Sequence, residues 1–215
     1  MLREVPSYTL FTILLIVGLV AIAVAKSIDP KRFREFIMVI GNSKYLKIYG
    51  KDQKFLDYYD GALFLNLIIS SAIFLALCIQ GFTGEAYMDL TLIVKLIVGI
   101  GVFILSKVLL ERLIGSLFEI DYLIDDYLFQ KISYKNYLGL LLLPINALLI
   151  FSFSPTLPLI YTVFGILFIV NISGLFTTFK VYQNEIKSNL FYFILYLCAL
   201  EIAPYVVIYS IYSAF

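Results

Sequence analysis

Six long apolar runs divide this chain, and they restrict it to folds that a lipid bilayer can hold. Each run has about 18–24 residues, enough for a helix to cross a hydrocarbon core of ~30 Å. The chain has 215 residues and a mean hydropathy of +0.97. We therefore predict an all-α, polytopic membrane bundle with six transmembrane helices, built as one integral membrane domain over residues 1–215. The predicted spans lie near residues 7–25, 61–80, 90–110, 136–153, 156–178 and 189–212.

The positions of the cations predict the orientation of the bundle. Thirteen of the sixteen Lys and Arg residues lie in three segments between spans, 26–60, 111–135 and 179–188. Basic segments stay on the cytoplasmic side, so we expect these three inside and both termini outside. Residues 1–25 end like a signal peptide, but the apolar run is long for one, and we interpret it as a retained first helix.

A short amphipathic helix is predicted near residues 30–40, on the cytoplasmic side. Asp29-Pro30 is typical of a helix start and Gly41-Asn42 of a helix end. The apolar side chains at helical spacing are Phe33, Phe36, Ile37 and Ile40. The polar arc is expected to carry Lys31, Arg32, Arg34 and Glu35. Such a helix either docks a partner or anionic lipids, or packs under the bundle as a re-entry segment.

Glu201, in the sixth run, is the intramembrane residue that most needs a partner. It lies about 18 Å into the run, near the bilayer midplane, where an unpaired carboxylate is costly. We expect it to be buried and hydrogen-bonded, with Asn146 or Tyr205 as the favoured partner and Lys95 as the less favoured one. A proton or ion relay, a subunit contact, and an acid that only joins two helices are the roles open to it.

Two further amides, Asn66 and Asn171, form a second candidate pair. Both fall about 8 Å from the inner face of the membrane if their helices rise by the usual 1.5 Å per residue. Amides at this depth commonly hydrogen-bond between helices and supply packing. We therefore expect an inter-helix contact between them.

Several classes of active site are disfavoured by composition and spacing. The chain has no His, which removes His-ligated metals and His-based catalytic triads. One loose cluster of acids follows the third run: Glu119, Asp121, Asp125 and Asp126. Mg²⁺–diphosphate enzymes need two facing clusters, so we interpret this one as a solvated helix face. We predict no catalytic residues, metal or cofactor.

The third run itself keeps helical periodicity to residue 118, which predicts a helix that protrudes from the membrane.

The run Leu197-Cys198-Ala199-Leu200-Glu201-Ile202-Ala203-Pro204 resembles the C-terminal signature of a Bacteroidota family catalogued as domain of unknown function 4271. The Gly139-Leu140-Leu141-Leu142-Leu143-Pro144 and Asp29-Pro30-Lys31-Arg32-Phe33 stretches are also similar to that family. The resemblance implies a multi-pass protein of the bacterial inner membrane, and it implies no activity.

Two functions from different classes remain. The leading hypothesis is a non-enzymatic integral inner-membrane subunit or assembly partner of a cell-envelope protein complex. Its partners would be other inner-membrane proteins and anionic lipids at the cytoplasmic face, with no nucleic acid. The alternative is a small proton- or ion-coupled transporter or channel that uses Glu201. A lipid-modifying enzyme that uses the acidic cluster is a third reading.

Overall fold

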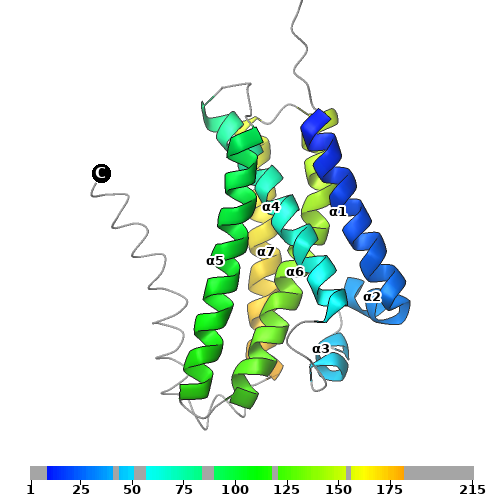
Figure 1. Cartoon of the computed structure of the whole chain (residues 1–215), viewed down its shortest axis with the longest axis vertical. Helices are drawn as coiled ribbons and strands as arrows, with labels where there is room; N and C mark the ends of the chain where they lie inside the picture. The colour runs from blue at the N-terminus through cyan, green and yellow to red at the C-terminus, as the bar shows by residue number, and fades with distance from the viewer. Residues whose placement is uncertain are drawn as a thin grey trace, which may run out of the picture.

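The computed structural model describes residues 9–40, 44–50, 57–83, 90–117, 121–153 and 156–181, and every regular element among them is an α-helix. In chain order the helices are α1 (Thr9–Ile28), α2 (Pro30–Ile37), α3 (Lys44–Tyr49), α4 (Tyr58–Thr83), α5 (Leu90–Leu117), α6 (Asp121–Phe151) and α7 (Leu157–Val181) (Figure 1). Five of them, namely α1, α4, α5, α6 and α7, are long and apolar enough to cross a membrane. The chain therefore has the helical, multi-span character that its apolar runs predict.

The described helices follow the predicted spans, with differences at their ends. The third run and its extension to residue 118 form one helix, α5, which ends at Leu117. The fourth run begins at 136 in the sequence, but its helix, α6, begins at Asp121. The early start reflects burial, because Leu128 and other side chains of this polar-looking segment face the bundle. The sixth predicted span, 189–212, lies outside the described residues.

Helix α4 is the central helix of the bundle. In its most apolar stretch 61% of the residues are buried, compared with 22% in α5 and 17% in α7. It packs against α1, α5, α6 and α7, as the ribbon shows (Figure 1). Helix α6 approaches α4 closely at Gly139, where an added Cβ would lie 2.6 Å from the Cα of Leu67. The α4–α6 interface therefore lies in the buried interior of the bundle.

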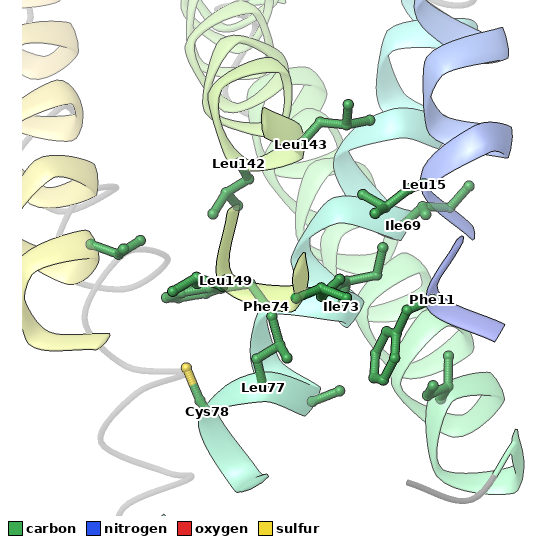
Figure 2. Close-up of a cluster of buried hydrophobic side chains, with 14 of the residues drawn as sticks. Phe11, Leu15, Ile69, Ile73, Phe74, Leu77, Cys78, Leu142, Leu143 and Leu149 are labelled. Atoms are coloured by element: carbon green, nitrogen blue, oxygen red, sulfur yellow. The ribbon is translucent and has the colours of Figure 1, made fainter. Parts of the chain in front are cut away.

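The bundle has two chemically different ends. We call the end that carries α2 and α3 the platform end, and the opposite end, where α1 begins and α4 finishes, the far end (Figure 1). The far-end core consists of hydrocarbon side chains from α1, α4, α6 and their neighbours, some of which Figure 2 shows. Its members include Phe11, Leu15, Ile69, Ile73, Leu77, Leu142, Leu149 and Ile160. Since lipid tails are as apolar as these side chains, the core holds the helices together by close packing rather than by escape from water.

Helix α2 begins as the sequence predicts. The Asp29 side chain accepts a hydrogen bond of 2.9 Å from the backbone N–H of Arg32, and Pro30 occupies the first helical position. The helix ends at Ile37, earlier than the predicted residue 40, because the backbone tightens there: the N–H groups of Met38 and Val39 bond to the carbonyls of Glu35 and Phe36, three residues back instead of four. The predicted cap at 41–42 lies outside the described residues.

Aromatic rings attach α2 and α3 to the bundle. Phe36 of α2 is fully buried. Its ring centroid lies 5.6 Å from that of Tyr45 in α3, 6.0 Å from that of Tyr137 in α6 and 6.5 Å from that of Tyr59 in α4. All three pairs have the edge-to-face geometry that favours aromatic contacts. We call α2 and α3, held in this way, the platform.

Candidate functional site

A buried arginine occupies the centre of the platform end. Arg32 of α2 is 5% exposed. Its Nη1 donates to Asp57 Oδ2 and its Nη2 donates to Asp60 Oδ2, each over 2.7 Å. The guanidinium carbon lies 4.3 Å from the ring centroid of Tyr59 and 5.3 Å from that of Tyr49, within the range of cation–π attraction. This cluster, the Arg32 joint, ties α2 to the start of α4.

The burial of Arg32 corrects the sequence-based expectation that it lies on a solvated arc. Lys31 and Arg34 are exposed, as expected, whereas Arg32 points inward. The reason is that its two partners come from a distant segment, 25 and 28 residues further along the chain. Asp57 and Asp60 are one helical turn apart, so they share a side at the start of α4. Together they compensate the guanidinium, whose planar fork suits two carboxylates.

The electrostatics of the joint keep Arg32 charged. Burial by itself lowers the pKa of Arg32, but the neighbouring Tyr45 and Asp60 raise it, and the net shift is upward. Burial raises the pKa of Tyr45, and Asp60 raises it further, although Arg32 opposes this. The joint therefore combines a permanent cation with two carboxylates and a neutral phenol at physiological pH. It is suited to holding helices in place, not to delivering a proton.

A second buried ion pair connects α5 and α6. Lys131 Nζ donates to Glu111 Oε1 over 2.5 Å, and the Glu111 side chain is fully buried. A neighbouring pair, Arg112 with Asp125, is longer at 3.4 Å, and its side chains are 42% and 48% exposed. Exposed pairs contribute little to stability, whereas breaking a buried pair is costly. The Glu111–Lys131 pair is therefore the one that we expect to fix the register of these two helices.

The acids after α5 do not form a metal centre in the part of the chain that the structure describes. Asp125 is exposed and faces Arg112, and Glu119 lies outside the described residues. No group of three or more His, Cys, Asp or Glu side chains within the described ranges is arranged to hold a metal ion.

The residues predicted around Glu201 are only partly described. Asn146 is fully buried, and its Nδ2 donates to the backbone oxygen of Ser70 in α4 over 2.8 Å. Lys95 is exposed on α5. Glu201 and Tyr205 lie outside the described residues, so their contact with Asn146 or Lys95 stays a prediction.

The second predicted pair is not brought together. Asn66 is fully buried, and its Oδ1 accepts a hydrogen bond of 3.2 Å from the Ser70 hydroxyl one turn away. Asn171 is exposed, and its Nδ2 donates over 3.2 Å to the Leu167 carbonyl of its own helix. Each amide is therefore bonded within its own helix, and the expected contact between α4 and α7 is not formed by these two residues.

The four apolar residues of the predicted interfacial helix divide into two groups. Phe33 and Phe36 are buried against the bundle, whereas Ile37 and Ile40 are exposed. The exposed side of the platform combines basic side chains of α2 with apolar side chains of α2, of the turn after it and of α3. The residues are Lys31, Arg34, Ile37, Met38, Ile40 and Ile48. We call this set the platform surface.

Neither the Arg32 joint nor most of the buried polar groups of α6 were predicted from the sequence. Asp57 and Asp60 were the available signal, because two acids one turn apart at the start of an apolar helix can face the same cation. For α6 the signal was weaker. Ser133 and Asn136 are almost completely buried, yet they fall in a segment whose polar composition is typical of a solvated helix.

Comparison with known proteins gives one match. A family model described as Domain of unknown function (DUF4271) matches residues 11–212. The match covers nearly all of the chain, including the described helices. No curated protein and no solved structure matches the chain.

Proposed function

The chain belongs to the DUF4271 family, whose description names no activity, and we propose its role from the site itself. We propose that it is a non-enzymatic integral subunit or assembly partner of a membrane protein complex in the inner membrane of a Bacteroidota-type envelope. It engages its partner through the platform surface. This proposal rests on one observation: a buried Arg32 joint fixes in place a short helix whose outer side is both basic and apolar.

A buried ion pair can fix the arrangement of helices without adding much stability. Removing charges from water costs about as much as the pair returns, so such pairs add little net stability. What they can add is a single, fixed arrangement of the elements that they join. Arg32, Asp57 and Asp60 fix α2 against α4, and thereby fix the surface that α2 presents. A surface held at this cost is a good candidate for the working part of the protein.

The composition of the platform surface suits a protein partner. Ile37, Met38 and Ile40 are exposed beside Lys31 and Arg34. Protein interfaces favour an apolar centre with Met and Arg and are depleted of Lys and of acids, so Lys31 suits the polar rim of such an interface and the other residues its centre. The clustering of cations in segment 26–60 supports placing this surface at the cytoplasmic face, where it also meets anionic lipid headgroups.

A pull-down in mild detergent tests the proposal. The tagged full chain should retain a fixed set of membrane proteins, identified by mass spectrometry. Arg34→Ser and Ile37→Ser should each reduce the captured partner, while the monodispersity of the chain is unchanged. Arg112→Ser is the matched control, since Arg112 is exposed on α5, outside the platform. Equal capture by the platform variants and the control would overturn the docking role.

Orientation has its own test. A cysteine introduced at exposed Ile48 should react with an impermeant thiol reagent only after the inner membrane is permeabilised. Reaction in intact spheroplasts would place the platform outside and contradict the proposed cytoplasmic partner.

Proton- or ion-coupled transport through Glu201 is the second candidate. Its supporting observation is that Asn146, fully buried in the α4–α6 interface, has a side-chain oxygen without a hydrogen-bond partner among the described residues. Such an acceptor suits a protonated carboxyl group as donor. Glu201→Gln keeps the shape of the side chain but cannot release a proton. Transport by the parent in proteoliposomes, abolished in Glu201→Gln with the fold intact, would support this candidate over the first.

A further inference from the structure

Buried polar side chains of α4 and α6 lie between the platform end and mid-bundle. On α4 they are Tyr59, Asn66 and Ser70. Asn66 and Ser70 follow Tyr59 by seven and eleven residues, which places all three on one side of the helix. On α6 they are Ser133, Asn136 and Asn146. All six residues are 2% exposed or less. We call these six the polar column.

The column starts at the Arg32 joint. Tyr45 of α3 lies against both Arg32 and Ser133, so it connects the joint with the first α6 member of the column. From there the column extends thirteen residues along α6 to Asn146, which is about 20 Å of helix. The Asn146 amide donates to the Ser70 carbonyl, and the Ser70 hydroxyl donates to Asn66, so hydrogen bonds connect the part of the polar column nearest the far end.

The column contains more hydrogen-bonding atoms than its own residues satisfy. Six buried atoms have no hydrogen-bond partner within the described part of the chain: the hydroxyl oxygens of Tyr59 and Ser133, Asn66 Nδ2, Asn146 Oδ1, and both Nδ2 and Oδ1 of Asn136. The set includes donors as well as acceptors. Folded proteins pair almost all such groups, with protein atoms or with ordered water. Inside a bilayer there is no bulk water to substitute.

We propose that the polar column is a hydration site, which holds a chain of ordered water molecules between the Arg32 joint and Asn146. Water is the ligand whose chemistry fits. A single molecule both donates and accepts, and it needs two to four polar partners in a buried site. The amides of Asn136 and Asn66 and the phenol of Tyr59 offer such partners.

Among the described residues the water chain has its opening at the platform end. At the platform end the column reaches Asp57, whose side chain is 44% exposed and offers contact with solvent. Beyond Asn146 the interface becomes the far-end core, where Ile73, Leu77 and Leu149 are hydrocarbon and buried (Figure 2). Apolar packing of this kind stays dry. Within the described part of the chain the column is therefore a path that brings water to mid-bundle and stops there.

Water-edited solid-state NMR of the full chain in lipid bilayers tests this inference. Magnetisation transferred from water should reach the side-chain amides of Asn136 and Asn66 about as early as it reaches exposed platform side chains such as Arg34. The methyl groups of Ile73 and Leu149 should gain intensity only at long mixing times. If the Asn136 and Asn66 amides are as slow as these methyl groups, the column is dry and the proposal is wrong.

A variant sharpens the result. Asn136→Leu removes two of the unpaired atoms that lie between the Arg32 joint and Asn146, and it should interrupt the chain of water. We expect the Asn66 amide to lose most of its early water-transferred intensity. Asn171→Leu, which removes an amide outside the column, should leave the Asn66 signal unchanged. Unchanged transfer to Asn66 in Asn136→Leu would overturn the continuous chain. If Asn136→Leu does not fold, Ser133→Ala applies the same test with a smaller change.

Discussion

At the far end Ile73 of α4 packs among hydrocarbon side chains of α1 and α6, whereas at the platform end Tyr59 of the same helix faces Arg32. One helix is thus held by two kinds of contact along its length. The far-end core offers many interchangeable contacts. The platform end depends on a few paired charges and aromatic rings, each with a particular partner.

The difference follows from what lipid can replace. A leucine that leaves the far-end core meets lipid tails of similar polarity, so only packing is lost. An arginine or aspartate that loses its partner is left as an uncompensated charge near the membrane. Substitutions that remove a partner at the platform end should therefore reduce stability more than substitutions of one apolar residue by another at the far end.

The largest effect is expected at Arg32. Arg32→Met keeps much of the side-chain volume but leaves Asp57 and Asp60 together without their cation. We expect a loss of about 3 kcal/mol, near the lower end for a broken buried pair, because Asp57 is partly solvated. Unfolding by SDS titration in mixed micelles measures it. Arg34→Met, an exposed neighbour on the same helix, should change stability by about 0.5 kcal/mol or less. Equal losses would show that the joint is not specific.

The far-end core should respond through volume alone. Ile73→Ala leaves a cavity beside Leu77 and Phe11, and we expect a loss of about 2 kcal/mol, at the low end for large-to-small changes. Ile73→Leu, which keeps the volume, should cost less than about 1.5 kcal/mol. The same SDS titration measures both, with the exposed Ile169→Ala as control. A larger cost for Ile73→Leu than for Ile73→Ala would contradict the interchangeable character of this core.

The boundary between the two regions lies near Gly139. A Cβ at this position would lie 2.6 Å from the Leu67 Cα, so Gly139→Ala must push α4 and α6 apart. We expect a loss of about 1–3 kcal/mol from overpacking. Gly165→Ala on α7 is the matched control, since nothing lies within 4 Å of its added methyl group. Loss of thermal stability in detergent by the control as well would mean that helix propensity, not close approach, determines the result.

These regions also differ in how far the sequence discloses them. The far end follows from hydrophobic periodicity, so α1, α4, α5 and α7 were predicted within a few residues of their ends. Arg32 was assigned to the wrong side of its helix, since a helical wheel contains only local neighbours and its partners come from α4. Ser133 and Asn136 were not singled out as buried polar residues, because polarity alone cannot distinguish a buried polar stripe from a wet one.

Asn146 tests the upper end of the polar column with a smaller effect. Asn146→Ala removes the hydrogen bond to the Ser70 carbonyl, which still keeps its own helical partner. Inter-helix hydrogen bonds in membranes contribute about 0.6 kcal/mol on average and rarely more than about 1.7. We expect a loss in that range by SDS titration, with Asn171→Ala as the exposed control. A loss above that of Arg32→Met would place the anchor of the bundle at mid-depth instead of at the platform.

The smallest effect appears only at alkaline pH. Burial, with help from Asp60, raises the pKa of Tyr45 above its ordinary value of 10.0, although Arg32 opposes the shift. Above pH 10.0 the unfolded chain loses this proton while the folded chain keeps it. The contribution of Tyr45 to the free energy of unfolding is therefore complete below pH 10.0 and declines as the pH rises further. At that pH the loss from this single group is about 0.4 kcal/mol. Thermal stability in detergent between pH 8 and 10 should fall less steeply in Tyr45→Phe than in the parent, while exposed Tyr58→Phe should follow the parent. A parent curve that Tyr45→Phe reproduces would mean that the phenol is not held neutral by the joint, and the platform end would then be closer in character to the far-end core than its charges suggest.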